Sequence, residues 1–191
     1  MQGFTDRKLE IVKTASLLFN KLGYKNVTMR VLAEEMGIKA ASLYNHIASK
    51  QEILSTVIIS MAEQFTDSMA SVMDNDLTPV EKIKSIIIHH IEITLNDPHG
   101  TASLQNDWIY LEGDNMVHFK RMRKQYENNF KLIIENGIEV GAIKNVNSET
   151  MLFSILTTLR SLYIWFPRQE QMDKEKLKVD MIRVLLDGIR T

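Results

Sequence analysis

Cysteine is absent from the 191-residue sequence, which excludes disulfide bonds and thiolate metal sites. The first ten residues, MQGFTDRKLE, lack the apolar stretch of a signal peptide. The longest apolar run, residues 151–166, is shorter than the ~20 residues that a membrane span needs, and Arg160 interrupts it. Together these absences predict a cytoplasmic protein without a membrane segment.

Motifs for catalysis and metal binding are also missing. The sequence has no nucleophile elbow, no phosphate-binding loop, no paired-carboxylate motif, and no HExxH or Cys–His spacing. The histidines that raise the question of a metal sensor are His89, His90, His99 and His118. Adjacent histidines on a helix point ~100° apart and chelate one ion poorly. We therefore predict a protein that is not an enzyme and needs no metal or cofactor, and metal sensing stays a weaker alternative.

The distribution of charge along the chain is uneven, although the net charge is only −1. Residues 1–50 contain eight Lys and Arg against four Asp and Glu, which gives +4. Residues 51–191 contain fifteen against twenty, which gives −5. A basic head on an acidic body is what DNA binding by the first fifty residues requires, although chance could also produce it.

Apolar residues recur at helical spacing through almost the whole chain, and no segment shows sustained strand alternation. Ser49 and Glu52 form a capping box, and Thr78 followed by Pro79 and Glu81 marks a second helix start. We expect an all-α fold with a three-helix head, residues 1–48, and a helical ligand-binding and dimerisation body, residues 49–191. The first expected helix ends near residue 23. The others are expected over residues 28–36, 39–47, 49–73, 78–96, 101–111, 116–141, 148–166 and 173–189.

The second and third helices have the spacing of a helix-turn-helix, with Gly37 in the turn. Leu43 and Ile47 would anchor the third helix in the head, so that its other face can enter a major groove. Small side chains at residues 40–42 would let the backbone approach the bases. The residues expected on the groove side are Lys39, Ala40, Ser42, Tyr44, Asn45 and His46.

The stretch from Ile11 to Leu54 resembles the DNA-binding domain of the TetR/AcrR family. The segments LFNKLGY, VTMRVLAEEMGI and SLYNHIASKQEIL occur in the order and at the spacing of that family. The resemblance implies a ligand-responsive repressor that binds a palindromic DNA operator as a homodimer.

The resemblance also implies roles for single residues of the head. Thr28 would cap the second helix and contact phosphate, and Lys50 would place its ammonium on a phosphate. Lys39, Ala40 and Ser42 would face bases, whereas Tyr44 and His46 would bind the DNA backbone, with Asn45 in the same surface. Two alternatives without DNA contact remain open: Tyr44 could pack on the first helix, and His46 could simply be exposed to solvent.

The body contains apolar side chains that would line a ligand pocket, although each one could equally belong to an ordinary core. We expect candidates of this kind to point inward from the middle helices. They are Met61, Phe65, Ile87, Ile91, Trp108, Met116, Phe119, Tyr126, Phe130, Phe153 and Tyr163. Apolar stripes on residues 151–166 and 179–189 are the expected dimer elements.

Cationic residues in the body indicate what such a pocket would bind. Arg160 lies inside an apolar run and needs a partner, either a ligand anion or a residue of a second subunit. Arg123 belongs to a basic segment, residues 120–124, which is either a solvated helix face or an anion site. The segments RKQYENNFKLIIENGIEVGAIKN and LRSLYIWF resemble TetR-type regulators of acyl-coenzyme A thioesters. The resemblance implies a hydrophobic effector of that class.

Two other functions remain open from the sequence. A regulator of an efflux pump would bind cationic or aromatic drugs, for which the carboxylates of Glu63, Glu92, Asp107 and Glu112 are available. A DNA-bound architectural or activator protein would need no ligand.

Overall fold

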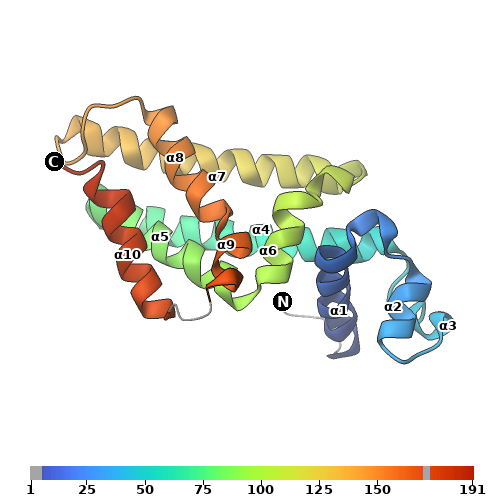
Figure 1. Ribbon diagram of the computed structural model, residues 1–191. Coiled ribbons are helices and arrows are strands. Elements are labelled where there is room, and N and C mark those ends of the chain that lie inside the picture. Colours follow the sequence, from blue (N-terminus) through green and yellow to red (C-terminus); the bar gives the residue numbers. More distant parts are fainter. Residues whose placement is uncertain (1–5, 170–172) are drawn as a thin grey trace. The chain divides into compact units, whose positions relative to one another are not determined.

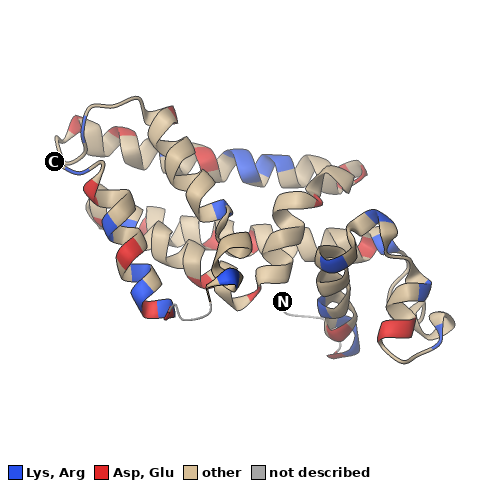
Figure 2. Ribbon diagram, in the orientation of Figure 1, with Lys and Arg blue, Asp and Glu red and all other residues tan. Residues whose placement is uncertain are grey.

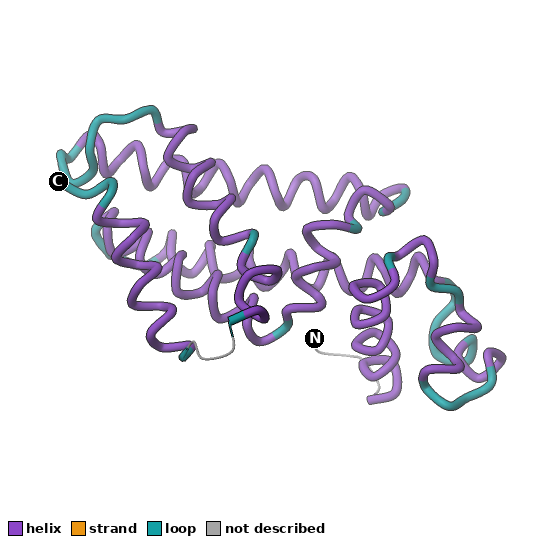
Figure 3. The backbone as a smooth tube through the Cα atoms, in the orientation of Figure 1, coloured by secondary structure: helices purple, strands orange, loops and turns teal. Residues whose placement is uncertain are grey.

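The computed structural model describes residues 6–169 and 173–191, and these residues form an all-helical fold, as the sequence predicted (Figures 1 and 3). The first five residues of the segment inspected for a signal peptide lie outside the described residues. None of the described helices has the length and apolar character needed to cross a membrane. The elements are α1 Asp6–Leu22, η1 Tyr24–Asn26, α2 Met29–Glu35, α3 Ala40–Leu43, α4 Lys50–Asp74, α5 Pro79–Asn96, α6 Pro98–Asn106, η2 Trp108–Tyr110, α7 Gly113–Glu139, α8 Ser148–Arg160, α9 Leu162–Trp165, η3 Phe166–Arg168 and α10 Lys174–Asp187.

The chain divides into two compact units. Unit 1 comprises the chain up to Glu63 together with Asp97–Lys120, and unit 2 comprises Gln64–Asn96 together with Arg121–Thr191. The first unit therefore combines the helix-turn-helix with the beginning of α4, α6, η2 and the beginning of α7. The second unit contains the remaining helical body.

Unit 1 is built around the apolar face of α1, where Ile11 and Ala15 are fully buried and Phe19 is nearly so. The turn between α2 and α3 needs Gly37, whose φ of 65° is a conformation that side chains with a Cβ rarely adopt. Leu43 and Ile47 are buried at 0% and 2% exposure, so the predicted anchoring of the third helix is confirmed.

Unit 2 buries the apolar faces of α5, α7 and α8 in a common core. Ile87, Phe130 and Leu159, one from each helix, are all fully buried. Gly137 allows α7 to pack closely on the following loop, because a Cβ at this position would clash with the side chain of Ile143. The core of the body therefore lies between helices that are distant in the sequence.

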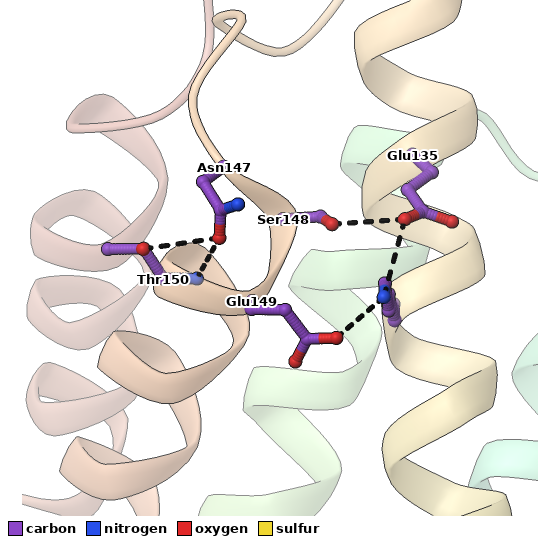
Figure 4. A network of polar contacts seen from close by, with 6 residues as sticks. Glu135, Asn147, Ser148, Glu149 and Thr150 are labelled. Atoms are coloured by element: carbon purple, nitrogen blue, oxygen red, sulfur yellow. Dashed lines mark hydrogen bonds and ion pairs between the residues drawn. The ribbon is translucent and has the colours of Figure 1, made fainter.

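A polar network fixes the start of α8 on α7 (Figure 4). The Ser148 hydroxyl donates to Glu135 Oε1 at 3.0 Å, and Lys131 Nζ lies 2.5 Å from Glu149 Oε1. The carboxamide oxygen of Asn147 accepts from the Thr150 amide at 3.0 Å and caps α8. These contacts join two helices that their apolar residues alone could hold in several registers.

Three of the expected helices have wrong boundaries. The helix expected over 148–166 is divided: α8 ends at Arg160, Ser161 forms a turn, and the rest follows as the short α9 and η3, the latter containing Pro167. The segment 97–100, interpreted as a breaker, instead starts α6: Asp97 accepts from the Gly100 amide at 2.8 Å. The α-helical part of the third helix is only Ala40–Leu43 and continues as turns.

Candidate functional site

The residues that the sequence predicted to contact DNA lie on α3 and in the residues directly before and after it. The side chains of Lys39, Ser42, Tyr44, Asn45 and His46 are exposed, and Ala40 is half-buried. Tyr44 retains 54% of its surface. Five of these six side chains are therefore exposed, and their contact with DNA stays a prediction.

Thr28 caps α2 as the sequence predicted. Its Oγ1 accepts from the Val31 amide at 3.2 Å, and the residue is exposed. The cap satisfies one free amide of the first turn of α2 and leaves the threonine at the surface. The phosphate contact of Thr28 stays a prediction.

Lys50 has different partners from those expected. Its Nζ donates to the carbonyls of Tyr24 and Val27 at 2.9 and 2.8 Å and lies 4.1 Å from the centroid of the Tyr24 ring. Burial lowers the pKa of this ammonium. The ammonium thus ties the start of α4 to the η1 segment, and only its remaining N–H is available for the predicted phosphate.

Methionine at Lys50 tests which of the two roles dominates. The free energy of unfolding is expected to fall by about 2 kcal/mol, because two carbonyls lose a charged donor. Urea unfolding measures this, and Lys39→Met is the matched control, since the Lys39 side chain makes no capping bond. Unchanged stability together with a weaker salt dependence of DNA binding would instead favour the phosphate role.

An aromatic stack joins the η1 and η2 segments within unit 1. The rings of Tyr24 and Tyr110 are 5.2 Å apart and nearly parallel, with the ammonium of Lys25 5.2 Å from the Tyr110 ring centroid. The carboxamide of Gln51 donates to the Tyr110 carbonyl at 2.7 Å. These contacts therefore connect the three-helix head to a segment almost ninety residues further along the chain.

Asp107, one of the carboxylates considered for drug binding, is 7% exposed. Burial raises the pKa of its carboxyl from 3.8 to about 6. It lies at the end of α6, where its amide donates to the Ser103 carbonyl at 2.8 Å. At neutral pH this carboxyl is ionised, and its burial then lowers the stability of the folded state.

The raised pKa of Asp107 predicts a pH dependence of stability. Because the folded pKa exceeds the unfolded value, the stabilisation from this carboxyl is full below pH 3.8, decreases as the pH rises to about 6, and is constant above. Asp107→Asn is expected to remove that decrease and to raise the free energy of unfolding at pH 7 by about 2–3 kcal/mol. Urea unfolding between pH 4 and 8 measures it, with exposed Asp67→Asn as control. An unaltered pH profile would contradict the assignment.

Unit 2 contains a buried aromatic cluster formed by α4, α5 and α7. The centroids of Phe65 and His90 are 4.6 Å apart, and those of Phe65 and Tyr126 are 6.4 Å apart with the rings edge to face. Burial raises the pKa of the Tyr126 phenol above its usual range, although Arg160 acts in the opposite direction. Burial, with a smaller contribution from Arg160, lowers the pKa of His90 to about 3, so this imidazole is neutral at physiological pH.

An ion-pair chain borders the aromatic cluster. Arg160 Nη2 lies 2.7 Å from Glu127 Oε1, and the same oxygen is 3.2 Å from Nε of Arg123. The side chains of Arg160 and Glu127 are 24% and 32% exposed. Burial opposes ionisation of Glu127, but the two arginines outweigh it and hold the pKa of this carboxyl below its usual value. Arg160 thus finds an intramolecular partner, which the sequence could not identify.

The structure separates the predicted ligand residues into groups. Phe65, Ile87, Ile91, Tyr126 and Phe130 are buried in unit 2, where Tyr163 and Arg160 are half-buried and Arg123 is exposed. Trp108, Met116 and Phe119 belong to unit 1, where the rings of Trp108 and Phe119 are 5.6 Å apart. The inward orientation expected for Phe153 is wrong, since it is 69% exposed on α8. Apolar periodicity placed it correctly on a helix but could not tell a core face from an interface.

Two residues of α5, His90 and Thr94, are not among the ligand residues that the sequence predicted. Both ring nitrogens of His90 and the Thr94 hydroxyl are buried, with no hydrogen-bond partner among the described residues. His90 had been considered only for metal, and the described part of the chain contains no group of three or more metal-binding side chains. A signal was present, because both residues recur with Ile83, Ile87 and Ile91 on the apolar face of one helix.

Comparison with known families identifies both parts of the chain. Residues 11–57 match the family described as bacterial regulatory proteins, tetR family, and residues 76–189 match the tetracyclin repressor-like C-terminal domain. The chain belongs to the TetR family. It is therefore a DNA-binding transcriptional repressor rather than an enzyme, and TetR-family regulators bind operator DNA as dimers.

Three relatives of this TetR-family chain cover almost its full length. The transcriptional repressor KstR2 of Mycobacterium tuberculosis is 22% identical over 96% of this chain and 92% of its own. The structure of that ketosteroid regulator superposes with a TM-score of 0.92 at 19% identity, covering 98% and 96% of the two chains. The fatty acid metabolism regulator of Bacillus subtilis is 20% identical over 95% and 94%. AibR in complex with isovaleryl coenzyme A and operator DNA has a TM-score of 0.81 at 22% identity, covering 94% and 97%.

Proposed function

We propose that this TetR-family repressor responds to an acyl-coenzyme A thioester, which binds in unit 2 and alters operator binding. The observation that supports the proposal is the junction of a buried aromatic cluster, Phe65 and Tyr126, with the Arg160–Glu127–Arg123 chain. An acyl group needs apolar surroundings, and the phosphates of the coenzyme need cations. Unit 2 contains both kinds of side chain next to each other.

Basic residues on α7 extend the cationic side of this site. Residues 120–124 include four Lys and Arg, which appear as a blue band on α7 in Figure 2. The relative AibR, whose structure contains isovaleryl coenzyme A, supports the effector class by its similarity of fold. A carboxylate site for a cationic drug has less support here, because Glu92 is paired with Lys178 at 2.8 Å.

The DNA-binding part of the proposal assigns phosphate contacts to Thr28, Tyr44 and His46 and base contacts to Lys39 and Ser42. Ala40 would allow close approach, and Asn45 would complete the surface. Exposure of this face supports the assignment. We assign the dimer contact to α8 and α10, which expose Phe153, Val179 and Val184 at 69%, 55% and 70%. Such large exposed apolar side chains favour a covered interface.

The experiment measures operator binding by fluorescence anisotropy at fixed salt, using DNA from upstream of the protein's own gene. Isovaleryl-coenzyme A is the probe, with free coenzyme A and isovalerate as controls. We expect tenfold or greater release by the thioester alone, and a loss of that response in Arg160→Met. Exposed Lys144→Met serves as the matched variant. Equal binding with and without the thioester would reject this effector while leaving the repressor in place.

A further inference from the structure

The polar atoms of His90 and Thr94 lie on one face of α5, one turn apart. His90 is 3% and Thr94 0% exposed, yet neither ring nitrogen nor the hydroxyl has a hydrogen-bond partner within the described ranges. Buried polar groups in folded proteins are nearly always satisfied, so an exception needs an explanation, and a bound molecule is one. A threonine inside a helix normally bonds a carbonyl of the preceding turn, so its free hydroxyl is notable.

Side chains from three other helices lie around His90 within unit 2. Phe65 of α4 packs on the His90 ring at 4.6 Å and meets Tyr126 of α7 edge to face. Arg160 of α8 acts electrostatically on both His90 and Tyr126. Glu127 pairs with this arginine at 2.7 Å, so the surroundings of His90 are aromatic rings and a guanidinium whose charge is already balanced.

The protonation state of His90 limits what can bind there. Burial and the nearby guanidinium keep its pKa at about 3, so the ring carries one N–H donor and one bare nitrogen acceptor. The Thr94 hydroxyl can donate as well as accept. A charged group would be disfavoured in these apolar surroundings, whereas an uncharged oxygen could accept hydrogen bonds from the His90 N–H and the Thr94 hydroxyl.

We propose that His90 and Thr94 form the polar end of the effector site and bind an uncharged oxygen of the effector, which in an acyl-coenzyme A is the thioester carbonyl. The carbonyl oxygen accepts from the His90 N–H and the Thr94 hydroxyl. This assignment rests on the proposed function and names the atoms that recognise the effector.

The first test needs no ligand. Thr94→Val removes an unsatisfied buried hydroxyl, so we expect the midpoint of thermal unfolding to rise by about 2–4 °C. The matched control is Thr101→Val, because Thr101 is equally buried but its hydroxyl donates to the Asp97 carbonyl at 2.9 Å. Its midpoint should fall. A fall of the same size in Thr94→Val would show that the hydroxyl is already satisfied and would overturn the proposal.

The second test compares isovaleryl-coenzyme A with its S-isoamyl thioether, which lacks only the carbonyl oxygen. We expect wild-type protein to bind the thioester at least tenfold more tightly by calorimetry, and Thr94→Val and His90→Leu to lose most of that preference. Ring ¹⁵N shifts of His90 should change with the thioester only.

The outcomes separate the two proposals. Failure of both compounds to bind rejects the thioester effector. The unfolding test then still decides whether the Thr94 hydroxyl lacks a hydrogen-bond partner. Equal binding of both compounds, or a preference that survives in both variants, overturns the recognition role of His90 and Thr94.

Discussion

Alanine at Tyr44 is expected to weaken operator binding about 100-fold without changing the fold. Tyr44 is 54% exposed at the end of α3, on the groove side of the helix-turn-helix. The proposed phosphate contact, worth about 1.5 kcal/mol, would be lost in each head, and a dimer would lose two, which together correspond to about 100-fold. Anisotropy titrations with operator and unrelated DNA should both show the loss, because phosphate contacts do not read sequence.

The control for Tyr44 is Lys13→Ala, an exposed residue of α1 on the same unit. Its operator affinity should change much less at moderate salt. The free energy of unfolding of both variants should stay within about 0.5 kcal/mol of wild type, as for other surface substitutions. Unchanged affinity of Tyr44→Ala would remove the tyrosine from the interface. A loss confined to the operator would make it a base-reading residue.

Alanine at Phe130 is expected to lower the free energy of unfolding by about 3–5 kcal/mol, the usual cost of emptying a well-packed aromatic position. Phe130 is fully buried on α7, among the largest buried side chains of the chain. The sequence proposed it as a ligand contact, but this burial makes it a core residue whatever else it touches. Urea unfolding followed by circular dichroism measures the loss.

Two variants accompany Phe130→Ala. Phe130→Leu should retain more than half of the lost stability, because it leaves a smaller cavity. Phe153→Ala is the exposed control, which should leave the stability of a monomer nearly unchanged and weaken self-association instead. A loss below about 1 kcal/mol for Phe130→Ala would show that the ring borders a preformed space rather than a packed core.

The features that the sequence predicted correctly depend on neighbours in the chain. The Thr28 cap, the Ser49 cap and the anchoring of Leu43 each involve residues a few positions apart or the apolar period of one helix. The Glu52 amide donates to Ser49 Oγ at 3.1 Å as predicted, but the Glu52 carboxylate accepts from the Ala48 amide at 2.7 Å, so only one half of the predicted capping box is confirmed. Interactions between residues this close in the chain can be predicted from the sequence.

The features that the sequence missed depend on partners far along the chain. Arg160 pairs with Glu127, Lys50 bonds the carbonyls of residues 24 and 27, and the imidazole of His90 meets Phe65. Apolar periodicity could not separate the exposed Phe153 from the buried Phe130, because both lie on amphipathic helices. Only the packing of several helices decides which apolar residue faces solvent, core or a second subunit.

The stack of Tyr24 on Tyr110 limits how this protein can be engineered. A chimaera that exchanges the DNA-reading head at a junction in α4 would separate the two rings, and it would also break the bond from Gln51 to the Tyr110 carbonyl. The exchanged segment would end at that junction, but unit 1 also contains residues 97–120, which lie further along the chain. A graft that redirects this repressor to a new operator should therefore either transplant both segments or keep the tyrosine pair and replace only the exposed residues of α3.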